Sequence, residues 1–253
     1  MAEFETVRRA GAGVRTAQID EGLRAHMTKV YGLMAVAMVI TGVVAYVVGT
    51  DFARATAGEP TMLLPVGLLQ AMFTSPLKWV VMFAPLAMVF ALSAGIQRMS
   101  EGAAQAAFWV FSALMGLSIS WIFAVFTGMS IAQVFFITAI AFAGLSLWGY
   151  TTKKDISAWG SFLIMGVIGL IVASLVNIWL ASPGLSFAVS AIGVLIFAGL
   201  TAYDTQNIKN TYLQLAASDQ SFLGKAAIMG ALTLYLDFIN LFSFLLSFLG
   251  NRE

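Results

Sequence analysis

The chain has 253 residues, of which 60% are hydrophobic and 10% are charged, whereas about a quarter of the residues in a soluble domain are charged. This composition excludes an ordinary soluble protein and indicates a polytopic membrane protein. The formal net charge of +1 argues against the basic face that a nucleic-acid partner would need. Because the chain has no cysteine, it has neither disulfides nor thiolate metal sites.

The first 28 residues mix acids and bases around Gly11 and Gly13 and contain no apolar core. A secretory signal would place an apolar stretch directly after a short basic start, so we interpret residues 1–28 as a cytoplasmic tail. In this interpretation His26 is a solvated tail residue. Residues 29–250 then form a single transmembrane domain, and residues 251–253 are a short C-terminal end.

Seven apolar runs follow the tail. Each is close to the roughly 20 residues that a helix needs to cross about 30 Å of hydrocarbon. The runs cover residues 30–48, 79–96, 106–126, 131–148, 159–180, 185–203 and 230–249. The sequence therefore predicts an all-α membrane protein with seven transmembrane helices.

Basic residues between the runs predict the orientation of the chain. If the N-terminus is cytoplasmic, the inner segments contain ten Lys and Arg residues and the outer segments contain three. The ten are Arg8, Arg9, Arg15, Arg24, Lys29, Arg98, Lys153, Lys154, Lys209 and Lys225, and the three are Arg54, Lys78 and Arg252. Because cytoplasmic loops carry the excess of basic residues, we expect the N-terminus inside and the C-terminus outside.

The first outer loop, residues 49–78, is the longest predicted connection outside the membrane. It contains an apolar run at residues 62–73, which is too short to cross the bilayer. A helix on the membrane surface is the preferred interpretation of this run, and a re-entrant segment is the alternative.

The last apolar run carries a narrow polar stripe. At about 100° per residue, one face collects Gly230, Thr233, Asp237, Asn240, Phe244 and Ser247. An Asp inside a span costs about 2.5 to 3.5 kcal/mol on insertion scales. We therefore expect Asp237 to have a partner, a water-filled cavity or a bound proton.

The sixth run carries a similar stripe, which ends in a second acid. Its members are Ser186, Ser190, Gly193, Phe197, Thr201 and Asp204. Along an ideal helix, Asp204 lies roughly 28 Å from the start of its run, whereas Asp237 lies only about 8 Å inside the same inner edge. The two acids therefore meet only if the sixth helix tilts or the last helix starts among the headgroups.

These residues resemble those of a known family. The motifs Tyr203-Asp204-Thr205-Gln206 and Leu236-Asp237-Phe238-Ile239-Asn240 lie at the ends of the last two spans of a seven-span chain with a basic tail. This combination resembles the Bax inhibitor-1 (TMBIM) family in its bacterial branch, over the whole membrane region. The stretch between the acids, residues 205–229, is longer than is usual in the family, which weakens the registration of the two motifs.

The resemblance has implications for fold and function. It implies six helices packed around a central C-terminal helix, in a bacterial inner membrane. It also implies a calcium leak that responds to pH through a hydrogen-bonded aspartate pair, which maps onto Asp204 and Asp237. A basic residue of the second span is an alternative partner of the pair in this family, and Arg98 is the candidate here.

Elementary electrostatics supports the pairing independently. Two carboxylates about 4 to 5 Å apart repel each other by roughly 3 to 4 kcal/mol at an effective dielectric of about 20. We therefore expect the pair to share one proton up to near-neutral pH. Candidates for lining the seam around it are Thr201, Thr233, Asn240 and Ser247. Since Ca²⁺ prefers six to eight oxygen ligands, such a seam offers a weak calcium contact and no high-affinity metal site.

Three functions remain open at this point. The leading hypothesis is a pH-sensitive cation leak channel with calcium as the permeant ion, in which protons gate the flow. The first alternative is a regulatory protein that binds a membrane protein partner and restrains a membrane protease or a stress pathway. The second is a proton-coupled transporter. No phosphate-binding loop, metalloprotease motif or nucleophile motif is present in the sequence, so we expect neither an enzyme nor a cofactor.

Overall fold

The computed structural model describes the backbone of residues 2–251 and the side chains of residues 19–251. Predictions for the basic residues Arg8, Arg9, Arg15 and Arg252 fall outside the described side chains. The elements are α1 (Ala2–Thr56), α2 (Val66–Phe73), α3 (Leu77–Gly95), α4 (Glu101–Ile119), η1 (Ser120–Ala124), α5 (Gly128–Thr151), α6 (Trp159–Leu180), α7 (Pro183–Ser218), η2 (Gln220–Phe222) and α8 (Leu223–Leu249).

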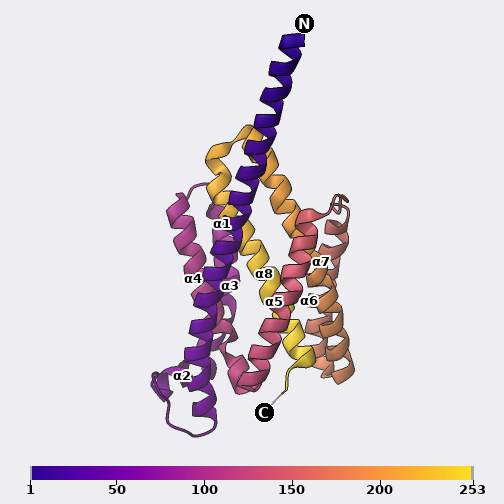
Figure 1. The fold of residues 1–253 in the computed structure, drawn as a ribbon. Coiled ribbons are helices and arrows are strands. Elements are labelled where there is room, and N and C mark those ends of the chain that lie inside the picture. Colours follow the sequence, from indigo (N-terminus) through magenta and orange to yellow (C-terminus); the bar gives the residue numbers. More distant parts are fainter. Residues whose placement is uncertain (1, 252–253) are drawn as a thin grey trace.

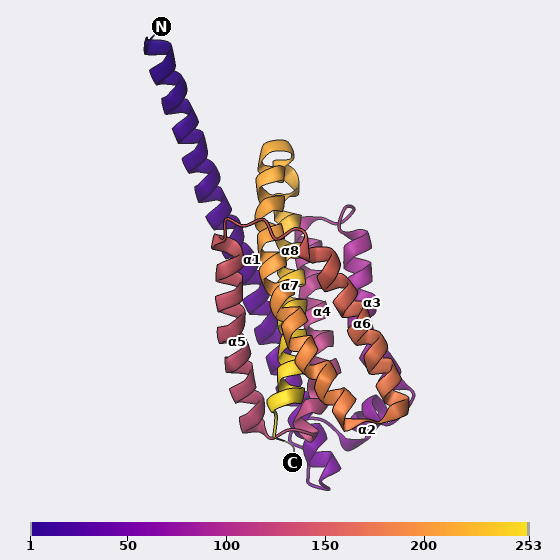
Figure 2. The same ribbon diagram turned by 90° about the vertical axis from the view of Figure 1, so that its right-hand side faces the viewer.

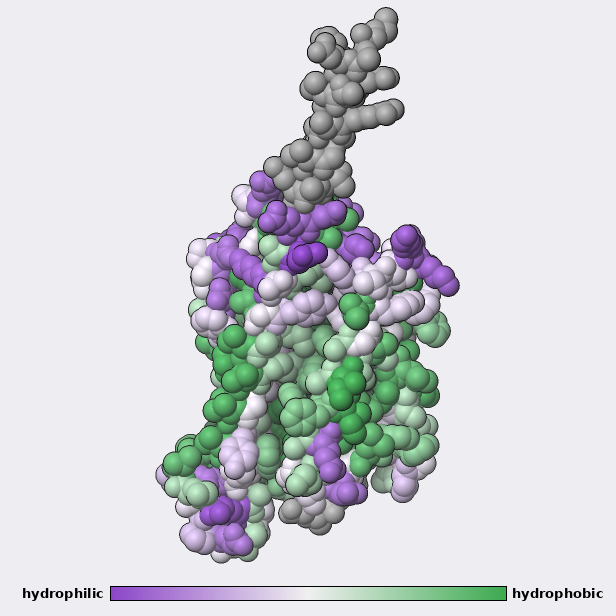
Figure 3. Space-filling view, in the orientation of Figure 1, coloured by the Kyte–Doolittle hydropathy of each residue, from purple (hydrophilic) through white to green (hydrophobic). Residues whose placement is uncertain are grey.

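Seven of these helices are long and apolar enough to cross a membrane, which confirms the predicted number of spans. The chain ends lie at opposite ends of the bundle (Figure 1), as an odd number of spans requires. We call the end with the α7–α8 connection the N-side and the end with α2 the C-side. The surface shows a hydrophobic band between two more hydrophilic ends (Figure 3). Which end faces the cytoplasm remains a prediction.

Helix α8 is the most deeply packed of the seven spans. Half of its span is buried, more than in any other spanning helix. It packs against α1, α4, α5 and α7, while α3 packs on α4 and α6 packs on α7. Figure 2 shows α8 passing between the other helices. Of the six helices expected around the C-terminal one, α1, α4, α5 and α7 make extensive contacts with it, whereas α3 packs mainly on α4 and α6 mainly on α7.

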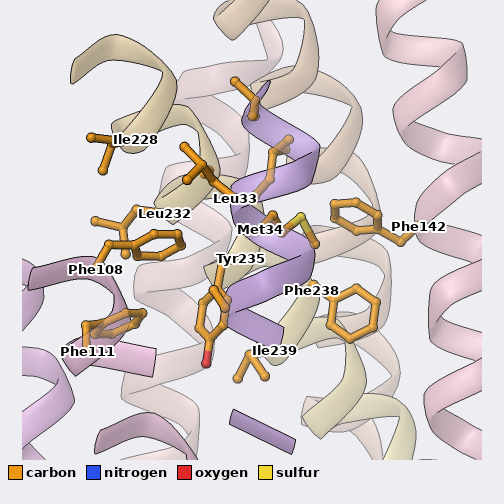
Figure 4. Packing of buried hydrophobic residues seen from close by; sticks show 14 of the residues in the cluster. Leu33, Met34, Phe108, Phe111, Phe142, Ile228, Leu232, Tyr235, Phe238 and Ile239 are labelled. Atoms are coloured by element: carbon orange, nitrogen blue, oxygen red, sulfur yellow. The ribbon is translucent and has the colours of Figure 1, made fainter. Parts of the chain in front are cut away.

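The interior around α8 is closed by aromatic packing. The ring of Tyr235 packs edge-on against Phe108 and Phe111 of α4, with ring centroids 6.0 and 5.2 Å away (Figure 4). Its hydroxyl lies 2.6 Å from Thr41 Oγ1 of α1, which in turn donates a hydrogen bond to the Ser112 carbonyl oxygen. Tyr235 thus ties three helices together by packing and by hydrogen bonds.

Helix α1 packs against the bundle earlier than the tail prediction implied. Leu23, His26 and Met27 are buried, so the prediction that His26 is a solvated residue is wrong. The physical reason is that the apolar spacing of Leu23, Met27 and Val30 continues the buried face of the helix toward its N-terminus. Hydropathy alone marks only the part of such a helix that lies in hydrocarbon.

The stretch between the two acids is helical. Helix α7 continues to Ser218 and α8 starts at Leu223, so that residues 205–229 form the N-side part of a helical hairpin. Both helices of the α7–α8 hairpin therefore continue beyond the hydrophobic runs, which end at residue 203 and begin at residue 230. Figure 2 shows the connection of the hairpin at the N-side end. This extension resolves the depth problem that the hydrophobic runs posed.

The outer loop begins with a polar anchor. The carboxylate of Asp51, which is almost fully buried, accepts hydrogen bonds from the backbone N–H groups of Met62, Leu63 and Leu64 at 2.6 to 2.8 Å. The short helix α2 then lies at the C-side end of the bundle, with Leu69 buried and Leu68 exposed (Figure 1). The helix covers only residues 66–73 of the predicted run 62–73, and its position on the membrane surface remains a prediction.

Candidate functional site at the aspartate pair

The two acids lie at the same level of the α7–α8 hairpin. Asp204 lies 14 residues before the end of α7 at Ser218, and Asp237 lies 14 residues after the start of α8 at Leu223. At about 1.5 Å per residue, both are roughly 21 Å from the connection. The two carboxyl groups are within side-chain hydrogen-bonding reach of each other.

The contact between the acids requires a proton. Two ionised carboxylates have only acceptor atoms and cannot hydrogen-bond to each other. Asp237 is 4% exposed, and its Oδ2 is buried without a partner among the fixed donors of the described residues. A proton held between the two carboxyl groups would satisfy this oxygen and remove the cost of an unpaired buried charge.

A cavity of about 190 Å³ reaches Asp204 from the N-side. Its polar lining residues are His26, Asp204, Asn207, Thr211 and Thr233, which come from α1, α7 and α8. His26 is the only histidine of the chain and packs on the ring of Tyr212 with a centroid distance of 5.0 Å. We call this space the N-side cavity.

The residues beside Asp204 hold α7 against α1, α5 and the α5–α6 link. Thr205 Oγ1 lies 2.8 Å from Ser146 Oγ, which lies 2.5 Å from the hydroxyl of Tyr31. Gln206 accepts a hydrogen bond from the N–H of Ile156 and donates one to the carbonyl oxygen of Lys154. These contacts fix the backbone on which Asp204 sits.

The two polar stripes face each other along α7 and α8, and we call this interface the α7–α8 seam. Thr201 is fully buried, and its hydroxyl donates to the carbonyl oxygen of Phe197. Thr233 lines the N-side cavity, Asn240 is half-buried and donates to the carbonyl oxygen of Leu236, and Ser247 lines a pocket at the C-side. The four predicted seam residues are therefore distributed along the whole interface.

Arg98 lies apart from the pair. It is exposed in the turn that follows α3, and no ion pair involving it is found among the described side chains. The ion pair found there joins Lys29 to Glu101 at 2.5 Å, and Lys225 donates to the carbonyl oxygen of Gln97. Arg98 as an alternative partner of the pair therefore remains a prediction.

The described residues 19–251 contain no group of three or more His, Asp or Glu side chains that is suited to hold a metal ion. The two carboxyl groups of the pair stand without a third acid. What they can do chemically is hold, share and release a proton, and offer up to four oxygen atoms to a passing cation.

Sequence reasoning missed His26 and the hydroxyl groups of Tyr31 and Ser146. A signal for His26 was present, because it lies on the same helical face as Leu23 and Val30. No comparable signal linked Tyr31 with Ser146, which lie on different helices and are brought together only by packing.

A bundle of seven apolar helices with two contacting acids inside it defines an integral membrane protein with a carboxyl pair in the interior of the bundle. Comparison with known proteins identifies the family. The family model described as inhibitor of apoptosis-promoting Bax1 (Bax1-I) matches residues 23–253. The chain therefore belongs to the Bax inhibitor family, which confirms the resemblance seen in the two aspartate motifs.

Close relatives come from several bacteria. The chain is 46% identical over 233 residues to the inner membrane protein YbhL of Escherichia coli K12, covering 92% of this chain and 94% of YbhL. It is also 46% identical over 239 residues to an uncharacterized protein of Caulobacter vibrioides, covering 93% and 92% of the two chains. A third relative, RP147 of Rickettsia prowazekii, is 46% identical over 235 residues, which is 92% of each chain.

Proposed function

We propose that the protein is a pH-sensitive cation leak channel of the bacterial inner membrane, with calcium as the permeant ion. The observation that supports it most directly is the contact between Asp204 and Asp237 inside the bundle. When the shared proton leaves, two negative charges face each other across the α7–α8 seam. Their repulsion, roughly 3 to 4 kcal/mol for carboxylates about 4 to 5 Å apart, is large enough to shift an equilibrium between two arrangements of these helices.

The polar seam supports a leak better than tight binding. Two carboxylates with nearby hydroxyl and amide oxygens fall short of the six to eight ligands that Ca²⁺ prefers, so an ion that enters is able to leave. A membrane potential of 100 mV favours inward movement of a divalent cation by about 4.6 kcal/mol. No further energy source is needed for net flow.

The test is calcium flux into liposomes that contain the purified protein, measured across a series from roughly pH 5 to pH 8. The proposal predicts pH-dependent flux for the wild type. Asp237→Asn and Asp204→Asn each remove the shared proton from the pair, so flux in these variants is expected to lose its pH dependence. Unchanged pH dependence in both variants contradicts the proposal.

Asp155→Asn is the matched control. Asp155 lies in the α5–α6 link, outside the spans, where the hydroxyl and the N–H of Ser157 donate to its carboxylate and lower its pKa. The carboxylate of Asp155 therefore stays ionised throughout the series. The stability that its hydrogen bonds contribute is lost only in acid below its ordinary pKa. We expect Asp155→Asn to keep the pH dependence of the wild type.

The same flux measurement tests the transporter alternative. Flux that saturates with substrate and moves protons in fixed ratio would favour a proton-coupled transporter over a leak channel.

A second candidate function is restraint of another membrane protein, and the description of the family as an inhibitor favours it. The N-terminal residues are the natural place for such binding. Deleting residues 2–18 leaves the buried residues of α1 from Leu23 onward in place. The deletion is therefore expected to abolish binding to a partner and to leave flux intact. If the deletion abolishes flux as well, the two functions cannot be separated in this way.

A further inference from the structure

Two separate cavities lie on the α7–α8 seam. The N-side cavity is lined by Asp204 of α7 and Thr233 of α8. At the opposite end, a pocket of about 610 Å³ is lined by Ser186 and Ser190 of α7 and by Ser247 of α8, with Asn177 of α6 beside them. We call it the C-side pocket. Both spaces thus open onto members of the same two stripes.

The C-side pocket offers neutral oxygen atoms. Asn177 Nδ2 donates to Ser186 Oγ at 2.7 Å, and Ser190 Oγ donates to the carbonyl oxygen of Ser186 at 2.9 Å. The described lining contains no charged residue. Hydroxyl and carbonyl oxygens of this kind replace part of the water around a cation without binding it tightly.

An apolar layer separates the C-side pocket from the aspartate pair. The ring of Phe244 lies directly over Gly193 of α7, where a Cβ would come within 2.6 to 2.7 Å of three ring atoms. The ring also stacks on Phe197, with centroids 5.7 Å apart. Because Gly193 has no side chain, the Phe244 ring closes flush against the backbone of α7.

We infer that Phe244, packed on Gly193, is the hydrophobic gate of the cation path, and that the C-side pocket is the entry site that holds a hydrated cation before it passes the gate. The inference rests on the proposed leak function for the identity of the ion. Phe244 lies two helical turns from Asp237, about 10 Å along α8. Repulsion between the two acids therefore acts on the same helix pair that clamps the ring, and separating α7 from α8 lets water past it.

The natural absence of cysteine makes this gate testable by thiol accessibility. Asn240→Cys places a thiol between Phe244 and Asp237, and Ser247→Cys places one in the C-side pocket. A membrane-impermeant maleimide is added outside sealed vesicles, and the reaction of Ser247→Cys defines the fraction of protein whose C-side faces outward. At neutral pH, Asn240→Cys is expected to react slowly behind the closed gate.

Opening the gate should expose this thiol. Adding Phe244→Ala is expected to raise the labelling rate of Asn240→Cys by one to two powers of ten, which is roughly what burial of a phenyl ring is worth. Gly193→Ala provides a second route, because its methyl group displaces the ring, and it should raise the rate in the same direction. Phe244→Leu keeps an apolar plug and should restore slow labelling.

The control is Phe162→Ala, which removes an exposed aromatic ring from the outer face of α6. It should leave the labelling of Asn240→Cys unchanged. Calcium flux at neutral pH is measured in parallel and should rise with Phe244→Ala. Monodisperse elution of each variant in size-exclusion chromatography confirms that it is folded.

The possible outcomes separate the gate from the leak function. If folded Phe244→Ala and Gly193→Ala proteins both leave the labelling rate unchanged, the gate is wrong even when the wild type shows pH-dependent calcium flux. If labelling accelerates but no variant passes calcium at any pH, Phe244 is upheld as a water barrier and the leak function fails.

Discussion

Ser146 Oγ on α5 and Thr205 Oγ1 on α7 lie 2.8 Å apart in the bundle interior, and Thr205 is the next residue after Asp204. Ser146 also reaches the hydroxyl of Tyr31 on α1. This short chain of hydroxyl groups joins three helices at the level of the aspartate pair. It therefore sets where the carboxyl group of Asp204 can lie.

Removing this chain should destabilise the protein in a defined order. Hydrogen bonds between helices in membranes contribute about 0.6 kcal/mol on average and up to about 1.7. Thr205→Val removes one contact between helices, together with the bond of its hydroxyl to the Thr201 carbonyl oxygen within α7. Ser146→Ala removes two contacts between helices, those to Thr205 and to Tyr31, and should cost more. Thermal unfolding of purified protein in detergent measures the difference. Thr151→Val is the control, since its exposed hydroxyl bonds only to carbonyls of its own helix.

The stability of the protein should depend on both interactions of Tyr235, the hydrogen bond of its hydroxyl and the packing of its ring. Tyr235→Phe keeps the packing against α4 and loses the hydrogen bond to Thr41, which is expected to cost about 1 kcal/mol. Tyr235→Ala also leaves a cavity and should cost about 3 to 5 kcal/mol, as for other large aromatic residues. Chemical or thermal unfolding compares the two variants. Equal losses would mean that the ring contributes nothing beyond its hydroxyl.

Tyr46→Phe is the control for the effect of removing a tyrosine hydroxyl, because Tyr46 is 61% exposed. We expect its unfolding to match that of the wild type. A loss as large as that of Tyr235→Phe would show that the effect does not depend on burial.

Asp51→Asn should loosen the outer loop. The carboxylate accepts three backbone hydrogen bonds, and an amide offers only one acceptor oxygen in place of two. Hydrogen bonds to a charged group contribute about 1.5 to 3 kcal/mol each, so the loop around residues 57–65 should open first. Limited proteolysis and hydrogen exchange of this loop measure the change. Glu59→Gln, an exposed acid in the same loop, should have no effect.

The ion pair between Lys29 and Glu101 should contribute little. Both side chains are substantially exposed, at 42% and 47%, and exposed pairs contribute about 0 to 1 kcal/mol. Lys29→Met and Glu101→Gln, alone and combined, should each shift the unfolding midpoint only slightly. A coupling energy well above 1 kcal/mol in this double-mutant cycle would show that the pair is shielded from solvent in the membrane.

Much of the fold follows from local sequence pattern. Seven apolar runs of bilayer length predict seven spans, because each helix must satisfy its own backbone hydrogen bonds in hydrocarbon. Helical periodicity alone places Asp204 and Asp237 on polar stripes, and the two motifs around them place the chain in its family. These features depend on residues within a few turns of one another, so the sequence is sufficient to reveal them.

Only the tertiary structure decided which of these residues meet. Hydropathy marks where a helix enters hydrocarbon and not where it ends, so the common level of the two acids emerged only from the full length of the α7–α8 hairpin. Other features depend on how separate helices pack. They are the burial of His26, the exposed position of Arg98 and the packing of Phe244 on Gly193. No local pattern encodes such contacts, because each one is fixed by the shape of a neighbour distant in the chain.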